Sequence, residues 1–170
     1  MYIGSVNGLF EINKVTKSLQ RIKNVDFKNT DQIHSLYFDK QNNYLWIGNT
    51  QGLLKYNLAT KEIRLINKDV NFESGTVFSI QKDSKENLWF SSYSGLWKLD
   101  IQKEAVRKYD NGDGLTIGTF GFGASTKSED GRLAFGGPKG ATLFNPSNLP
   151  REEGISKIDI SDFQVHGASV

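Results

Sequence analysis

A repeat with a period of 43 to 45 residues runs through this 170-residue chain and limits it to a small set of architectures. It is marked by four glycines, Gly8, Gly52, Gly95 and Gly140, which lie 44, 43 and 45 residues apart. Their surroundings agree, because the segments read YIGSVNGLFEIN, LWIGNTQGLLKYN, LWFSSYSGLWKLD and LAFGGPKGATLFN. The chain is therefore predicted to hold tandem copies of one structural unit.

Each unit is predicted to contain four short β-strands separated by polar turns. In the second unit the expected strands cover residues 33–39, 45–48, 53–56 and 62–66. Four antiparallel strands in a unit of this length are typical of a β-propeller blade, whereas a leucine-rich or helical solenoid has another period. We therefore predict an all-β fold, a partial β-propeller made of four-stranded antiparallel blades.

The tryptophans are interpreted as core residues. Trp46 and Trp89 recur at the same position of successive units, and Trp97 stands where other units have Leu54 and Phe10. A blade packs against a neighbour on each side, so its second strand should be apolar on both faces. Packing therefore explains the tryptophans better than stacking against a sugar does.

The repeat accounts for about three and a half blades, within residues 1–145. The chain opens at Tyr2, in what aligns with a second strand, two complete units follow, and the last unit supplies three strands up to Asn145. Closed propellers have ~4 to 8 blades. We therefore expect the C-terminal part of a larger propeller, which the remaining blades of a parent protein or a second copy in a homodimer would complete. Uncovered blade faces and strand edges should promote self-association.

Beyond Asn145 the pattern changes. Residues 146–170 are expected to be a linker, punctuated by Pro146 and Pro150, that leads into the first strand of a second β domain. Apolar residues alternate with polar ones in ISKIDISDFQVHG, as in a half-buried strand.

Composition excludes several classes of partner. The 21 basic and 19 acidic residues are interspersed, so nucleic acid is not an expected partner. No apolar run approaches the ~18 residues of a membrane span, so we expect no direct membrane insertion by this chain. There is no cysteine, and His34 and His166 lack partners at metal-ligand spacing. The segment DNGDG matches a calcium loop poorly, because its third residue is Gly112. We expect no catalytic group, metal or cofactor.

The repeat resembles a known family. VFSIQKDSKENLWFSSYSGLWKLD is similar to the two-component regulator propeller repeat, in which a strand with Ser and Asp precedes a turn, Leu-Trp, and Gly-Leu with an apolar strand. DGLTIGTFGFGASTKSEDGRLAFGGPKGATLFNPSNLP looks like the final blade before the three-tyrosine, immunoglobulin-like domain of the same proteins. The resemblance implies that residues 146–170 begin that domain.

The resemblance also implies a function. Such propellers form the extracytoplasmic, periplasmic sensor region of hybrid two-component histidine kinases, found in gut Bacteroidetes and linked to polysaccharide use. Their ligands are often oligosaccharides, and a bound ligand shifts the geometry of a dimer. This chain would then be a non-enzymatic binding segment of a kinase. A propeller-type lyase or hydrolase and a structural spacer for dimerisation are the alternatives.

Candidate ligand-binding residues are sought at one end of the blades. In a four-stranded meander, the turn between strands two and three lies at the same end as the connections between blades. Loops on a rigid scaffold commonly carry function. The residues at this end that differ most from the repeat are Tyr93, Phe72, Asp113, Gln51 and Lys139.

Overall fold

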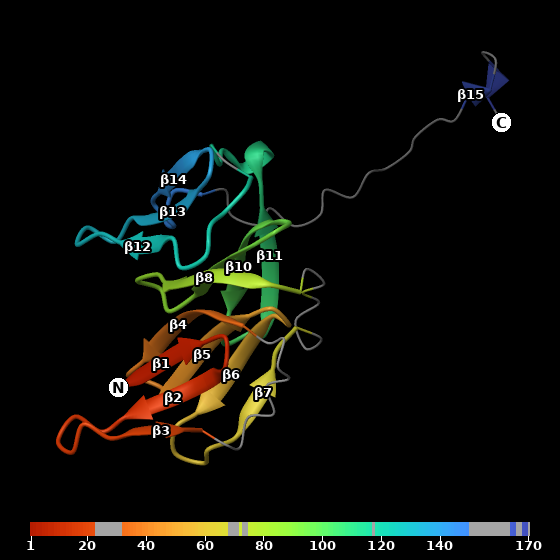
Figure 1. Cartoon of the computed structure of the whole chain (residues 1–170). Helices are drawn as coiled ribbons and strands as arrows, with labels where there is room; N and C mark the ends of the chain where they lie inside the picture. Colours follow the sequence, from red (N-terminus) through yellow and green to blue (C-terminus); the bar gives the residue numbers. More distant parts are fainter. Residues whose placement is uncertain are drawn as a thin grey trace.

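The computed structural model describes residues 1–22, 32–67, 72, 75–116 and 118–149, and the backbone of 164–165 and 168–169. Four antiparallel sheets of three or four strands follow one another along the chain, which confirms the predicted all-β, partial propeller fold (Figure 1). In this part of the chain the one helical element is the short 3-10 helix η1 (Asn111–Asp113).

Each sheet corresponds to one repeat unit. The first contains β1 (Tyr2–Ser5), β2 (Gly8–Ile12) and β3 (Leu19–Arg21). The second contains β4 (Ile33–Asp39), β5 (Tyr44–Asn49), β6 (Leu53–Asn57) and β7 (Ile63–Leu65). The third contains β8 (Val77–Lys82), β9 (Leu88–Ser92), β10 (Gly95–Asp100) and β11 (Ala105–Tyr109). The fourth contains β12 (Ser125–Lys127), β13 (Leu133–Gly137) and β14 (Gly140–Phe144).

A separate pair of strands lies in the expected second domain. β15 (Gln164–Val165) and β16 (Ala168–Ser169) form a short antiparallel hairpin. The remainder of the strand expected there, together with His166, falls outside the described residues. The assignment of residues 146–170 to a linker and an immunoglobulin-like domain therefore stays a prediction.

The glycines that mark the repeat form the turn between the second and third strand of each sheet. Gly8, Gly52, Gly95 and Gly140 have φ angles of 116°, 143°, 136° and 123°, a region that favours glycine. At Gly52 an added Cβ would also lie 2.1 Å from Oδ1 of Asn67. The repeat in the sequence thus records one turn geometry used four times.

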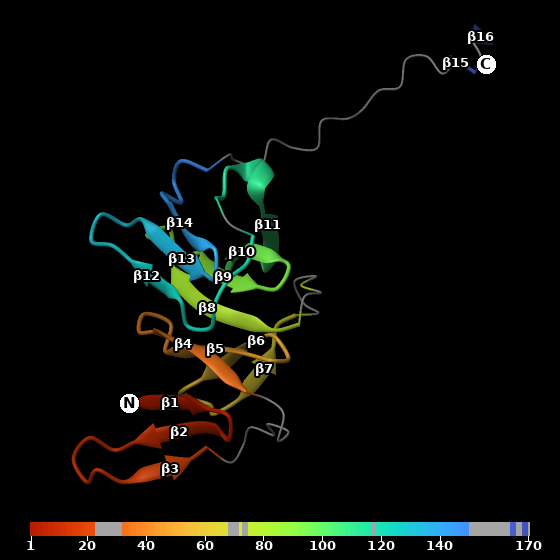
Figure 2. The ribbon, with the colours of Figure 1, turned by 45° about the horizontal axis from the view of Figure 1, so that its top comes forward.

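The core lies between the sheets, which stack side by side as blades (Figure 2). Trp46 of the second blade packs among residues of the third blade such as Phe90, and Trp89 packs among residues of the fourth such as Phe135. Both indoles are fully buried in equivalent positions, which confirms the interpretation as core. Trp97 packs edge-on against Phe72, with the ring centres 5.0 Å apart.

A buried ion pair links the second and third blades. Nζ of Lys82 lies 3.0 Å from Oδ2 of Asp39, at the end of β4, and also contacts the carboxylate of Glu86. Asp83 occupies the position of Asp39 in the next blade, where its carboxylate accepts a hydrogen bond of 2.9 Å from Nε1 of Trp89. One repeated aspartate therefore serves a contact between blades in one case and a contact within its own blade in the other.

Candidate functional site

The turns between second and third strands and the connections between blades do lie at one end, which we call the loop face. Nδ2 of Asn67, in a connection, donates to the carbonyl oxygen of Gln51 at 2.7 Å. The hydroxyl of Thr76, at the end of the same connection, donates to the carbonyl oxygen of Thr50 at 3.2 Å. The strand directions inferred from the repeat are thereby confirmed.

Three of the expected residues stand in the loop-face turns with exposed side chains. Tyr93 is 71% exposed and contacts the buried Phe78 at right angles, with ring centres 4.6 Å apart. Gln51 and Lys139 are exposed in the corresponding turns of the second and fourth blades. Because the three residues belong to three blades, they are spread along the loop face.

Asp113 has a structural role at its position in η1. It accepts a hydrogen bond of 2.9 Å from Nη2 of Arg107 and one of 3.1 Å from the backbone N–H of Asp110. Its carboxylate therefore fixes the turn after β11.

Phe72 departs from the expectation of a loop residue open to a ligand. Its side chain is 3% exposed and contacts Phe90 and Trp97 edge-on, with ring centres 5.1 and 5.0 Å apart. Phe72 thus closes the core between the second and third blades, and its ring is not open to a ligand at the loop face.

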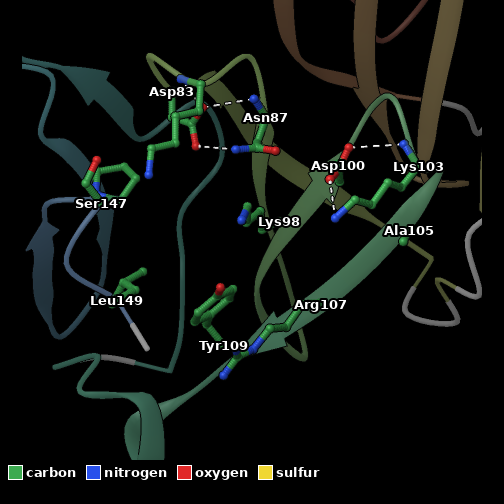
Figure 3. Close-up of a pocket in the computed structure, with 12 residues that line it drawn as sticks. Asp83, Asn87, Lys98, Asp100, Lys103, Ala105, Arg107, Tyr109, Ser147 and Leu149 are labelled. Carbon is green, nitrogen blue, oxygen red and sulfur yellow. Dashed lines mark hydrogen bonds and ion pairs between the residues drawn. The ribbon is translucent and has the colours of Figure 1, made fainter. Parts of the chain in front are cut away.

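A pocket of about 310 Å³ lies away from these residues, between the third blade and the segment after β14 (Figure 3). Its walls are the turn after β8, the strands β10 and β11 with the turn that joins them, and the segment 146–149. The lining residues are Asp83, Lys85, Asn87, Lys98, Asp100, Lys103, Ala105, Arg107, Tyr109, Pro146, Ser147 and Leu149.

The acidic groups of this pocket are engaged by the turns they stabilise. The carboxylate of Asp83 accepts from the backbone N–H groups of Lys85 and Asn87 at 2.8 and 2.9 Å. That of Asp100 accepts from the backbone N–H groups of Gln102 and Lys103 at 3.1 Å.

Basic groups outnumber the acidic ones in the lining: Lys85, Lys98, Lys103 and Arg107. In Figure 3 the Lys98 side chain stands in the middle of the hollow, between the two aspartates and Tyr109. The guanidinium of Arg107 lies over the ring of Tyr109, 4.6 Å from its centre. The pocket is therefore a polar, mainly cationic hollow.

The equivalent position at the second blade, where the third blade packs against it, is filled by side chains. There Lys55 and Arg64, which stand 43 residues before Lys98 and Arg107, border a void of only about 20 Å³. Leu99 and Ile101 of the third blade cover that site. At the third blade, the segment 146–149 stands where Leu99 and Ile101 stand at the second blade. Sequence reasoning overlooked the pocket, although the repeated Lys and Arg, followed by a unit with three strands, were a signal for it.

Among the described residues, no group of three or more His, Cys, Asp or Glu side chains is arranged to hold a metal ion. In the same residues, no helix has both the length and the apolar character that a membrane crossing requires.

No protein-family model matches the chain. A curated relative, histidine kinase P4 of Formosa agariphila, is 30% identical over 95 residues, which are 56% of this chain and 7% of that protein. The chain thus spans a small part of this relative.

Solved structures share the fold. The extracellular domain of the putative hybrid two component system BT3049 from B. thetaiotaomicron has a TM-score of 0.72 and 19% identity, over 99% of this chain and 24% of its own. That of BT4673 from the same organism has a TM-score of 0.67 and 17% identity, over 84% of this chain and 19% of its own. Sqt1 of Saccharomyces cerevisiae has a TM-score of 0.54 and 17% identity, over 88% of this chain and 41% of its own. These likenesses show the fold, and the histidine kinase relative agrees with the resemblance found in the sequence.

Proposed function

We propose that this chain is a ligand-binding segment of the periplasmic sensor region of a hybrid two-component regulator. The observation that carries the proposal is the shared fold with an extracellular domain of such a system over 99% of the chain. The 30% identity to a histidine kinase over 95 residues supports the same assignment. The parent protein would supply the kinase, the membrane anchor and the remaining blades, and this segment would act by binding alone.

The proposed ligand is an oligosaccharide from polysaccharide breakdown. A ligand can shift an equilibrium between two arrangements only as far as it binds one of them better than the other. Each blade is packed through a large core and would move as one rigid unit. A ligand that contacts two blades would therefore favour one relative position of these blades. In a homodimer, such a change would reach the kinase through the segment 146–170.

The test is calorimetric titration of the intact sensor region with a panel of oligosaccharides, with kinase output of the full-length receptor as the second measurement. Binding of one sugar class, together with a change in output, supports the proposal. An intact region that binds no carbohydrate but retains its dimer would instead support the structural spacer. Turnover of the added oligosaccharide, detected by chromatography, would support the lyase or hydrolase.

A further inference from the structure

The pocket of Figure 3, here called the cationic pocket, contains two basic residues that face each other across neighbouring strands. Lys98 and Arg107 stand directly opposite each other in the antiparallel pair of β10 and β11. Lys55 and Arg64 stand opposite each other in the same way in β6 and β7 of the second blade. Like charges placed opposite each other destabilise a sheet. Each of these two blades therefore needs other groups to balance a pair of cations.

In the second blade, groups of the protein itself balance the pair. The ammonium of Lys55 lies over the ring of Tyr44, 4.1 Å from its centre. Glu104, in the turn between β10 and β11, borders the small void beside Lys55 and Arg64. An aromatic face and a carboxylate both stabilise a nearby cation. The cations of the second blade are therefore both covered and compensated.

The third blade has neither the ring nor the carboxylate at the equivalent positions. Asn87 stands 43 residues after Tyr44, and Leu149 stands 45 residues after Glu104. Both Asn87 and Leu149 line the cationic pocket. An amide and an aliphatic side chain thus replace the aromatic ring and the carboxylate, and the volume of the hollow is about 310 Å³ instead of about 20 Å³.

The carboxylates in and beside the pocket are engaged elsewhere. Asp113 accepts from Arg107 at 2.9 Å. Asp100 lies 3.6 Å from the ammonium of Lys103 and accepts from backbone N–H groups of its own turn. Asp83 accepts from the N–H groups of the turn after β8 and from an indole N–H. Each of these carboxylates therefore already has partners.

Lys98 is left without an ion pair in the part of the chain that the structure describes. Its side chain is half-buried and stands in the middle of the hollow (Figure 3). A cation that is removed from water without a partner of opposite charge is unfavourable. Lys85 and Ser147 line the same hollow and carry further hydrogen-bond donors. The hollow is therefore suited to a negatively charged group from outside the chain.

We propose that the cationic pocket binds a small oxyanion, meaning a carboxylate, phosphate or sulfate group, at the ammonium of Lys98. The oxyanion takes the role that the carboxylate of Glu104 has at the second blade. Arg107 contributes a planar guanidinium, whose shape matches oxyanions. The segment 146–149 forms the facing wall, so a bound anion holds this segment against the third blade. The inference goes beyond the proposed function and does not depend on which ligand the sensor region recognises.

The experiment is isothermal titration calorimetry of the full chain with sodium phosphate, sodium sulfate and sodium succinate. Sodium chloride keeps the ionic strength constant, which separates binding from general screening. Lys98→Gln removes the cation, and Lys98→Arg retains it. Ser147→Asp adds a carboxylate to the lining at an exposed position. Lys55→Gln is the matched control, because Lys55 is the equivalent cation of the second blade; circular dichroism checks that every variant keeps the fold.

We expect at least one of the three anions to bind, and Lys98→Gln and Ser147→Asp each to weaken its binding about tenfold, as the loss of one charge-assisted hydrogen bond implies. Lys98→Arg and Lys55→Gln should bind as the wild type does. Binding of phosphate and sulfate alone would identify a tetrahedral group, and binding of succinate alone a carboxylate. No binding of any of the three anions overturns the inference. Binding that Lys98→Gln leaves unchanged, or that Lys55→Gln weakens equally, overturns it as well.

Discussion

The ammonium of Lys82 and the carboxylate of Asp39 lie 3.0 Å apart in the buried boundary between the second and third blades. Lys82→Ala would leave that carboxylate buried without its cation. Removing one partner of a buried pair costs about 3–5 kcal/mol, so we expect the free energy of unfolding to fall by that amount. Urea unfolding measures it. The control is Lys103→Ala, which breaks an exposed pair with Asp100 and should cost less than about 1 kcal/mol; equal effects of the two changes would contradict this account.

Acid should weaken the same boundary. Burial alone would raise the pKa of Asp39, but hydrogen bonds from Asn42 and Lys82 outweigh burial and lower this pKa below its usual value of 3.8. A carboxyl whose pKa is lowered by folding stabilises the fold above its unfolded pKa, and the contribution is lost as the pH falls through the folded pKa. We therefore expect the stability of the wild type to fall more steeply below about pH 4 than that of Asp39→Asn.

The stabilisation that Lys82 provides should be lost as the pH rises, whereas that of Asp39 is lost as the pH falls. Burial alone would lower the pKa of Lys82, but hydrogen bonds to Glu86 and Asp39 outweigh burial and raise the pKa above its usual value of 10.5. Its contribution is complete below that value and is lost as the pH rises through the folded pKa. Urea titrations of the wild type and Asp39→Asn across both ranges test the two directions, and parallel curves in acid would refute the prediction for Asp39.

The two buried tryptophans should respond differently to loss of the indole N–H. Nε1 of Trp89 donates to the carboxylate of Asp83 at 2.9 Å, whereas Nε1 of Trp46 has no partner in the described residues. Trp89→Phe should therefore lower the free energy of unfolding by about 1–3 kcal/mol more than Trp46→Phe does. Chemical denaturation of the matched pair gives the difference, which disappears if the hydrogen bond does not stabilise the blade.

Two turn glycines offer a second matched pair. Gly52 and Gly140 have similar positive φ angles, but an added Cβ at Gly140 meets open space, whereas at Gly52 it strikes the side chain of Asn67. Asn67 must then give up its hydrogen bonds to the N–H of Leu53 and the carbonyl oxygen of Gln51. We expect Gly52→Ala to destabilise the chain by about 1–3 kcal/mol more than Gly140→Ala. Thermal unfolding that ranks the two equally would show that Asn67 is not needed.

The blades could be predicted because each uses the same few signals. A glycine with positive φ and a tryptophan between sheets recur at one spacing, and both reflect local geometry that the sequence must encode. The burial of Phe72 could not be predicted in this way, because it depends on the contacts of its ring with Phe90 and Trp97 rather than on the repeat.

The candidate site was harder to predict from the sequence than the fold was. The place of Tyr93 in a loop-face turn could be predicted from the repeat, but the ring contacts that His34 and Phe122 make with Phe78 could not. A bulge in each of β4 and β8 inserts one residue and shifts the alternation by one position, and strands of only six or seven residues are too short to show that shift in one sequence. The cationic pocket depends on how the segment 146–149 packs against the third blade, and the repeat does not encode that contact.

The boundary between the second and third blades and the boundary between the third and fourth differ in the side chains that cross them. An ion pair between Asp39 and Lys82 spans the boundary of the second and third blades. Uncharged groups span that of the third and fourth, where Nε2 of Gln81 donates to the hydroxyl of Ser125 at 3.2 Å and the N–H of Gly123 donates to the carbonyl oxygen of Phe78. Protonation of Asp39 would weaken the contact with Lys82 and leave the hydrogen bonds of the other boundary unchanged. If a force pulls the blades apart, the pH would therefore determine which of the two boundaries separates first.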